Sequence, residues 1–222
     1  MKSLKEHILE GILDIEDNIN IDSSEITKDV IEKFLKDNYN ISGSYTIKEI
    51  KHKFIVDIKG SVRVKNKNIT SLTNEFFEFG SVDGGFNCSH CDSLKTLEGA
   101  PKVVNSSFYC NSCKSLTSLE GAPQKTGGDF DCGVCNSLKT LEGAPKEVRG
   151  NFECDRCESL TSLKGAPKEI GKNFYCSRCE SLTSLEGAPQ KVGGDFYCTN
   201  CVIHFKKYDV EKYTKVTKNI YV

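Results

Sequence analysis

The sequence predicts an α+β protein whose larger part is a solenoid of short repeats. A 22-residue unit recurs without insertion or deletion, each unit combines strand-like and turn-like segments, and a smaller helical and β region precedes the array. The phenylalanine that opens each unit recurs at Phe86, Phe108, Phe130, Phe152, Phe174 and Phe196. A fixed period of this length is typical of solenoids, in which each unit buries its apolar face only against its neighbours.

Composition excludes several functional classes. The chain has 222 residues, with 30 basic and 31 acidic side chains, so it offers no basic surface for nucleic acid. No apolar run approaches the roughly 18 residues that a membrane helix needs. The first residues lack the apolar core of a secretory signal. We therefore expect a cytoplasmic protein with reduced thiols, binding neither nucleic acid nor membrane.

Residues 1–40 are predicted to form an N-terminal helical segment. A first amphipathic helix is expected within 1–20, where apolar residues follow a helical spacing. A second helix is expected to begin at an N-cap within 22–24 and to end around 37–40. Its apolar stripe consists of Ile26, Val30, Ile31, Phe34 and Leu35.

Residues 41–85 change to a period of two, which predicts two or three short strands and an atypical capping repeat. Gly43 is expected to form a turn, and Gly60 is expected to end a strand. Val62 then begins a degenerate copy of the repeat, and terminal units of solenoids are usually atypical because one side must face water.

Residues 86–205 contain six units of the form Phe-x-Cys-x-x-Cys-x-Ser-Leu-x-x-Leu-x-Gly-Ala-Pro-x-x-Val, the sixth being incomplete. Phenylalanine and the first cysteine share strand parity, so both should point into the core. Gly-Ala-Pro should close the turn that the leucines begin, and the valine should start the return. Residues 206–222 are expected to form a C-terminal cap, as a short helix or a closing strand.

These units resemble leucine-rich repeats, specifically the short bacterial kind in which Leu-x-x-Leu precedes a proline-containing turn and a parallel strand. The family's Leu-x-Leu-x-x-Asn is matched by Phe174-x-Cys176-x-x-Cys179, over roughly residues 60–205. The sequence of the unit also resembles repeat proteins of bacteriophages and gut bacteria. If a phage encodes the chain, its location would be the host cytoplasm. The resemblance implies a parallel β-sheet on the concave face of the solenoid.

One departure from the family concerns the asparagine that normally ties adjacent turns. Cysteine occupies its position here, and a thiol is a weak hydrogen-bonding group. We therefore expect the serine two residues further on to take over this bonding. These serines are Ser93, Ser115, Ser137, Ser159 and Ser181.

The residues expected on the concave face vary between units while the scaffold positions stay constant. Tyrosine and arginine among them are side chains that often anchor interfaces. We expect a non-enzymatic scaffold that binds an unidentified protein partner, with no cofactor and no catalytic residues, because no nucleophile–base pair or phosphate loop is evident. The candidate binding residues are Tyr109, Asp131, Glu153, Arg156, Tyr175, Arg178, Asp195 and Tyr197.

The 12 cysteines allow an alternative function. All fall in six Cys-x-x-Cys pairs, and pairs from adjacent repeats could form four-cysteine zinc sites. Strand parity and the varied residues between the cysteines favour packed core thiols, while disulfides or a redox role remain open. The candidate metal ligands are Cys88, Cys91, Cys110, Cys113, Cys132, Cys135, Cys154, Cys157, Cys176, Cys179, Cys198 and Cys201.

Overall fold

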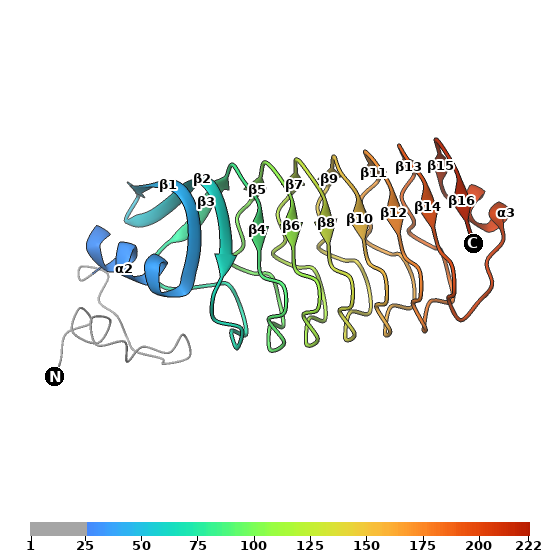
Figure 1. Cartoon of the computed structure of the whole chain (residues 1–222), viewed down its shortest axis with the longest axis horizontal. Coiled ribbons are helices and arrows are strands. Elements are labelled where there is room, and N and C mark those ends of the chain that lie inside the picture. The colour runs from blue at the N-terminus through green and yellow to red at the C-terminus, as the bar shows by residue number, and fades with distance from the viewer. Residues whose placement is uncertain (1–25) are drawn as a thin grey trace.

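The computed structural model describes residues 26–222, which form a mostly β structure with little helix. A parallel β-solenoid of about eight turns extends along the long axis, with a helix and a hairpin at one end (Figure 1). The expected α+β class is therefore corrected. Residues 86–205 contain no helix, because each Leu-x-x-Leu segment forms turns and irregular structure. The helix expected within 1–20 lies outside the described residues.

Helix α2 (Lys28–Asn38) confirms the second expected helix. Its N-cap is Thr27, whose side chain accepts a hydrogen bond from the backbone amide of Val30. This cap lies later than the one predicted at 22–24. Strand β1 begins at Tyr39, immediately after the helix. The buried side of the helix consists of Val30, Ile31, Phe34 and Leu35.

Strands β1 (Tyr39–Ile50) and β2 (Lys53–Val64) form an antiparallel hairpin with strands longer than predicted. The predicted turn at Gly43 and strand end at Gly60 are wrong, because the two glycines face each other inside the hairpin. The strands approach closely there. A Cβ on Gly43 would lie 2.2 Å from the carbonyl oxygen of Lys59, so this position requires glycine.

Strand β2 is also the first rung of the solenoid. It pairs in parallel with β3 (Glu78–Val82) and with β4 (Phe86–Asn87), whose first residue lies opposite Val62. Further along, the backbone amide of Leu72 donates to the carbonyl of Glu98 in the first regular unit. The predicted degenerate repeat at the start of the array is confirmed.

Each turn of the array contributes two strands of two residues, so two parallel rows run along the solenoid (Figure 1). The row that we call the Phe row consists of β4, β6 (Phe108–Tyr109), β8 (Phe130–Asp131), β10 (Phe152–Glu153), β12 (Phe174–Tyr175) and β14 (Phe196–Tyr197). The row that we call the Val row consists of β5 (Val103–Val104), β7 (Lys125–Thr126), β9 (Glu147–Val148), β11 (Glu169–Ile170) and β13 (Lys191–Val192). The rows join through β2, which pairs with β4 on one side and β3 on the other.

The C-terminal region adds a further turn. Helix α3 (Lys207–Glu211) buries Val210, β15 (Lys215–Val216) pairs with β13, and β16 (Ile220–Tyr221) pairs with β14. The predicted cap therefore contains both a short helix and closing strands. The two strands extend both rows, so the Phe and Val rows end together at this side of the molecule (Figure 1).

The core is built from the same side chains in successive turns. The phenylalanines of the Phe row form a continuous stack with ring centroids 5.1–5.7 Å apart. The cysteines and leucines of each unit lie beside this stack and are buried. Every unit therefore buries its apolar face against the turns above and below it, as expected for a solenoid.

Gly-Ala-Pro closes each of the five complete units, as predicted, and its glycine has a specific structural role. Gly143 has a φ of 88°, and the equivalent glycines of the other units are also left-handed. A Cβ on Gly143 would lie 2.3 Å from the backbone nitrogen of Glu120 in the preceding turn. Both the backbone conformation and the close stacking of turns therefore require glycine at this corner.

Candidate binding face

The side chains that project outward from the Phe row form one continuous strip, which we call the strand face. Parallel in-register pairing places equivalent residues of successive turns side by side. From the N-terminal end the strip contains Arg63, Asn87, Tyr109, Asp131, Glu153, Tyr175, Tyr197 and Tyr221. Five residues singled out from the sequence lie in it: Tyr109, Asp131, Glu153, Tyr175 and Tyr197.

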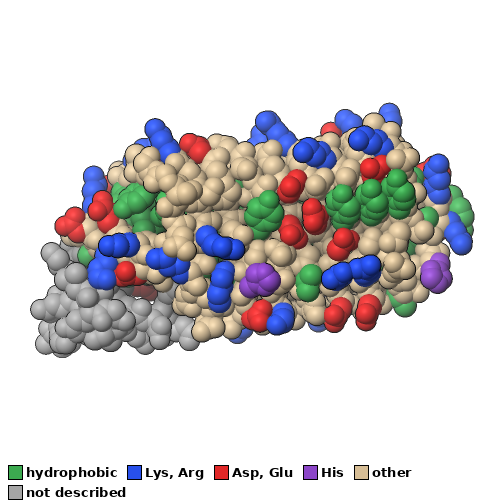
Figure 2. All heavy atoms as spheres, in the orientation of Figure 1, with side chains coloured by type: hydrophobic (Ala, Val, Ile, Leu, Met, Phe, Trp, Pro, Cys, Tyr) green, Lys and Arg blue, Asp and Glu red, His purple; other side chains and the backbone are tan. Residues whose placement is uncertain are grey.

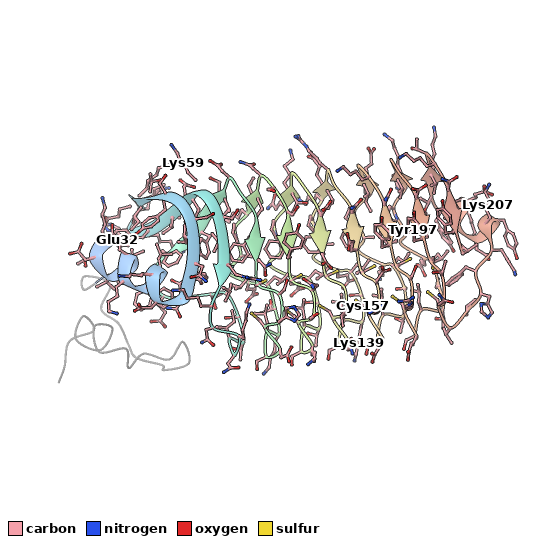
Figure 3. All side chains as sticks on the ribbon, in the orientation of Figure 1. Glu32, Lys59, Lys139, Cys157, Tyr197 and Lys207 are labelled. Carbon is pink, nitrogen blue, oxygen red and sulfur yellow. The ribbon has the colours of Figure 1, made fainter. Side chains whose placement is uncertain are left out.

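Three tyrosines at the C-terminal end of the strand face stack on one another. The ring centroids of Tyr175 and Tyr197 lie 4.7 Å apart at an interplanar angle of 9°, and those of Tyr197 and Tyr221 lie 4.6 Å apart at 6°. In Figure 2 a block of hydrophobic side chains lies on this face beside a group of acidic ones, and Figure 3 labels Tyr197 on its strand. The result is an ordered aromatic edge at the surface.

Tyr221 was missed by sequence reasoning, which ended the repeats before the C-terminal cap. A signal was present, because Ile220-Tyr221 repeats the apolar–tyrosine pair of Phe196-Tyr197. The interval is 24 residues instead of 22, since α3 replaces the usual corner. A search limited to the strict period therefore overlooks the last rung.

Two carboxylates, Asp131 and Glu153, separate Tyr109 from the tyrosine stack, and Asp155 lies two residues beyond Glu153. Burial, and then the charge of neighbouring carboxylates, raises the pKa of Glu153 from its ordinary 4.5 to about 7. Burial also raises the pKa of Asp131 and of Asp155. The middle of the strand face is therefore a place where negative charge is poorly solvated.

Arg156 and Arg178 lie beside the strand face, at the second residue between the paired cysteines. Their backbones are left-handed, with φ of 57° and 58°. Their charges partly offset the rise in the pKa of Asp155. Together with strand-face residues they line a groove of about 430 Å³. Six of the predicted residues border this groove: Asp131, Glu153, Arg156, Tyr175, Arg178 and Tyr197.

Asp195 does not line the groove but connects successive turns. Its backbone amide donates to Oδ1 of Asn173 at 2.8 Å, and its own Oδ1 accepts from the amide of Asn219 at 2.9 Å. The residue before the phenylalanine plays a similar part in the other units apart from the first, where it is Gly85; for example, Oγ of Ser107 accepts from the amide of Asp129. A recurring Ser, Asn or Asp at this position was the sequence signal for these hydrogen bonds between turns.

The cysteines form two buried columns of free thiols. The second cysteine of a unit donates to the backbone carbonyl of the first cysteine in the preceding unit, as Sγ of Cys135 does to Cys110 at 3.3 Å. Burial raises the pKa of Cys113 and of Cys176 to about 12, so these thiols are protonated at neutral pH. Within residues 26–222, no group of three or more His, Cys, Asp or Glu side chains is arranged to hold a metal ion.

These thiols make the hydrogen bonds between adjacent turns that we predicted for the serines. In the described part of the chain, the hydroxyls of Ser93, Ser115, Ser137, Ser159 and Ser181 make no hydrogen bond between turns, so that prediction is wrong. The serines are only half-buried, whereas each second cysteine lies directly against the carbonyl of the turn before it. A weak donor is sufficient where the stacking already sets the distance.

No family model matches the chain, and neither a curated protein nor a solved structure matches it. Across the residues that the structure describes, no helix has the length and apolar character to cross a bilayer.

Proposed function

We propose that this protein is a non-enzymatic scaffold that binds another protein through its strand face. The observation that carries the proposal is the surface stack of Tyr175, Tyr197 and Tyr221, next to a groove lined by both carboxylates and guanidinium groups. Tyrosine and arginine are enriched among the residues that contribute most to protein interfaces. The groove adds charges of both signs, which favour one orientation of a partner over others.

The tyrosine stack is also well ordered before any partner binds. Each ring restricts its neighbour, and the side-chain amide of Asn173 donates to the hydroxyl of Tyr175 at 2.8 Å. Ordering free side chains on association costs roughly 0.5–1.5 kcal/mol for each flexible side chain. Preorganised rings avoid much of this cost, which supports a role in recognition.

The charge of the strand face supports a protein as the partner. Asp131, Glu153 and Asp155 lie at its middle, where they would repel the phosphates of nucleic acid or of an anionic membrane. The whole chain carries a formal net charge of −1. Binding by this face requires no cofactor. We further propose a cytoplasmic setting, in the host cytoplasm if a phage encodes the chain, because the free thiols need reducing conditions.

A relationship to leucine-rich repeats is part of the proposal. Three features support it: the Leu-x-x-Leu segment, the proline-containing turn and the short parallel strand of each 22-residue unit. Cysteine occupies the positions of the second leucine and of the asparagine. In this relationship the strand face would correspond to the concave face that the family uses for binding.

The environment of the cysteines supports packing over the alternative of four-cysteine zinc sites. Zinc binds the thiolate, and burial holds these thiols in the protonated form. The second cysteine of each regular pair also has a carbonyl partner in the preceding turn, such as Cys132 for Cys157 at 3.3 Å. A zinc site would have to break these contacts and supply the cost of ionising the sulfurs.

The proposal is tested by affinity capture with matched variants. The tagged chain is compared with the double variant Tyr175→Ser/Tyr197→Ser and with Lys125→Ser/Lys191→Ser on the Val row. We expect the strand-face variant to lose recovery of a specific protein about tenfold or more, which corresponds to about 1.4 kcal/mol. The Val-row control should retain it.

Circular dichroism and thermal melts establish that both variants are folded. A partner retained in full by the strand-face variant, or lost equally from the control, would contradict recognition through the strand face. A deletion of residues 1–25 in the same experiment shows whether that segment contributes to capture.

A further inference from the structure

Four carboxylates crowd together at the middle of the strand face. Asp131 and Glu153 are paired residues on β8 and β10, Asp129 lies two residues before Asp131, and Asp155 lies two residues after Glu153. Acidic side chains gather between the hydrophobic ones on this face in Figure 2. Parallel strands lie about 4.8 Å apart, so in-register stacking brings like charges together that a twisted or shifted pairing would separate.

Three of these carboxylates have a backbone partner, and the fourth has none. Each aspartate accepts one hydrogen bond from a main-chain amide, which stabilises its charged form. These bonds run from Asn151 to Asp129, from Gly133 to Asp131 and from Ser177 to Asp155, at 2.7, 2.8 and 2.6 Å. Within the described residues, the carboxylate of Glu153 accepts no hydrogen bond and forms no ion pair. Glu153 is therefore the member least able to hold a negative charge.

The surrounding elements do not neutralise Glu153. Tyr109 on β6 and Tyr175 on β12 flank the acidic pair along the strip, and neither is a cationic side chain. The cations on this side, Arg156 and Arg178, act on Asp155. Glu153 instead experiences its own burial and the charges of the three aspartates, and all four effects favour its protonated form.

We propose that Asp131, Glu153 and Asp155 share a proton near neutral pH, held mainly by Glu153, which makes this part of the solenoid a proton-linked switch. Below pH 7 the cluster carries one negative charge fewer than above it. Given the function proposed above, the same proton would set how strongly the strand face attracts a cationic group of its partner.

The sign of the effect on stability follows from the shift. The folded chain holds the proton up to about pH 7, whereas an unfolded glutamate releases it near its ordinary value of 4.5. The folded state thus binds more protons in this window, and its stability falls as the pH rises from about 5 to 7. Above pH 7 both states are ionised and this contribution is absent.

The test is a carboxyl-detected ¹³C NMR titration of the purified chain between pH 3 and 9, without any partner. We expect the Glu153 carboxyl to titrate with a midpoint near 7. Asp131→Asn keeps an oxygen for the amide of Gly133 but removes one neighbouring charge, so the Glu153 midpoint should fall by about one pH unit. Glu120→Gln, at an exposed corner, should leave it unchanged.

Thermal melts of Glu153→Gln provide an independent readout that needs no resonance assignment. The melting temperature of the unmodified chain should fall between pH 5 and 7, and that of Glu153→Gln should be flatter across this window. A Glu153 midpoint between 4 and 5, or identical pH profiles for the two chains, would overturn the proposal. Neither result depends on whether the strand face binds a protein, so this failure is distinct from that of the proposed function.

Discussion

The strands within the Phe row and within the Val row pair in parallel and in register, and both rows turn apolar side chains inward. Their outward side chains differ. The outward positions of the Val row are Val103, Lys125, Glu147, Glu169, Lys191 and Lys215. Lys125 and Glu147 form an ion pair at 2.8 Å, with side chains about half exposed. Exposed pairs of this kind contribute at most about 1 kcal/mol. The outward side of the Val row is therefore ordinary solvated surface.

The outward side of the Phe row is different because it holds stacked tyrosines and crowded carboxylates. Neither feature is needed to stack the turns, since the phenylalanines, thiols and leucines already do so from the inside. The carboxylates are even unfavourable at neutral pH, because burial and mutual repulsion raise the pKa of Glu153. Of these two rows, the Phe row alone has an outward residue pattern that the stacking of the turns does not explain, and its outward side is the face that we propose for binding.

The largest expected effect concerns the inward side of the Phe row, which carries the thiols that the Val row lacks. At pH values above about 9 an unfolded chain releases thiol protons, whereas burial keeps the folded thiols protonated. Each such thiol then lowers the stability by about 1.4 kcal/mol per pH unit. With 12 cysteines in the chain, unfolding is expected between about pH 9.5 and 10.5, followed by far-ultraviolet circular dichroism.

A reducing agent and a chelator are present throughout this titration, and metal content is measured beforehand on protein purified without added zinc. Stability that persists to pH 11, or about one zinc ion for every four cysteines, would show that the sulfurs are not packed protonated thiols. It would also remove the distinction in acid–base behaviour between the interiors of the two rows.

A smaller effect separates the rows within a single turn. Phe130→Ala removes a ring from the continuous stack and should cost about 3–5 kcal/mol in urea denaturation. Val148→Ala, in the Val row of the same turn, should cost about 1.5–3 kcal/mol. The Val row already tolerates a buried polar side chain, since Thr126 occupies one of its inward positions. Equal costs for the two substitutions would mean that the phenylalanine stack is no more important than the second row.

The smallest effect concerns the residue that turns the chain after the Phe row. This residue is left-handed in every unit, and at Val134 it is β-branched, with a φ of 59° and an exposed side chain. Val134→Asn should raise the free energy of unfolding by about 1 kcal/mol. The converse change, Asn200→Val, should lower it by a similar amount, as measured in the same urea titrations. Opposite signs would mean that the left-handed conformation is not strained at this corner.

Much of the fold could be predicted from local pattern. The 22-residue period, the inward parity of phenylalanine and cysteine, the turn at Gly-Ala-Pro and the degenerate first repeat all follow from spacing and residue chemistry. The glycines of the hairpin could not be predicted in this way. Gly43 resembles a turn residue in sequence, but the close approach of Lys59 across the strand pair decides its role.

The candidate site, too, could be predicted only in part from the sequence. The sequence shows which outward-facing strand positions vary, because a comparison of the units separates constant scaffold positions from variable ones. Only the stacking of turns shows that Tyr221 completes the aromatic stack and that Asp195 connects backbones instead of lining the groove. The crowding of Asp131 and Glu153 likewise depends on the strand register. Sequence spacing specifies the direction of a side chain along one strand, but contacts between turns depend on distances that arise when the strands pair.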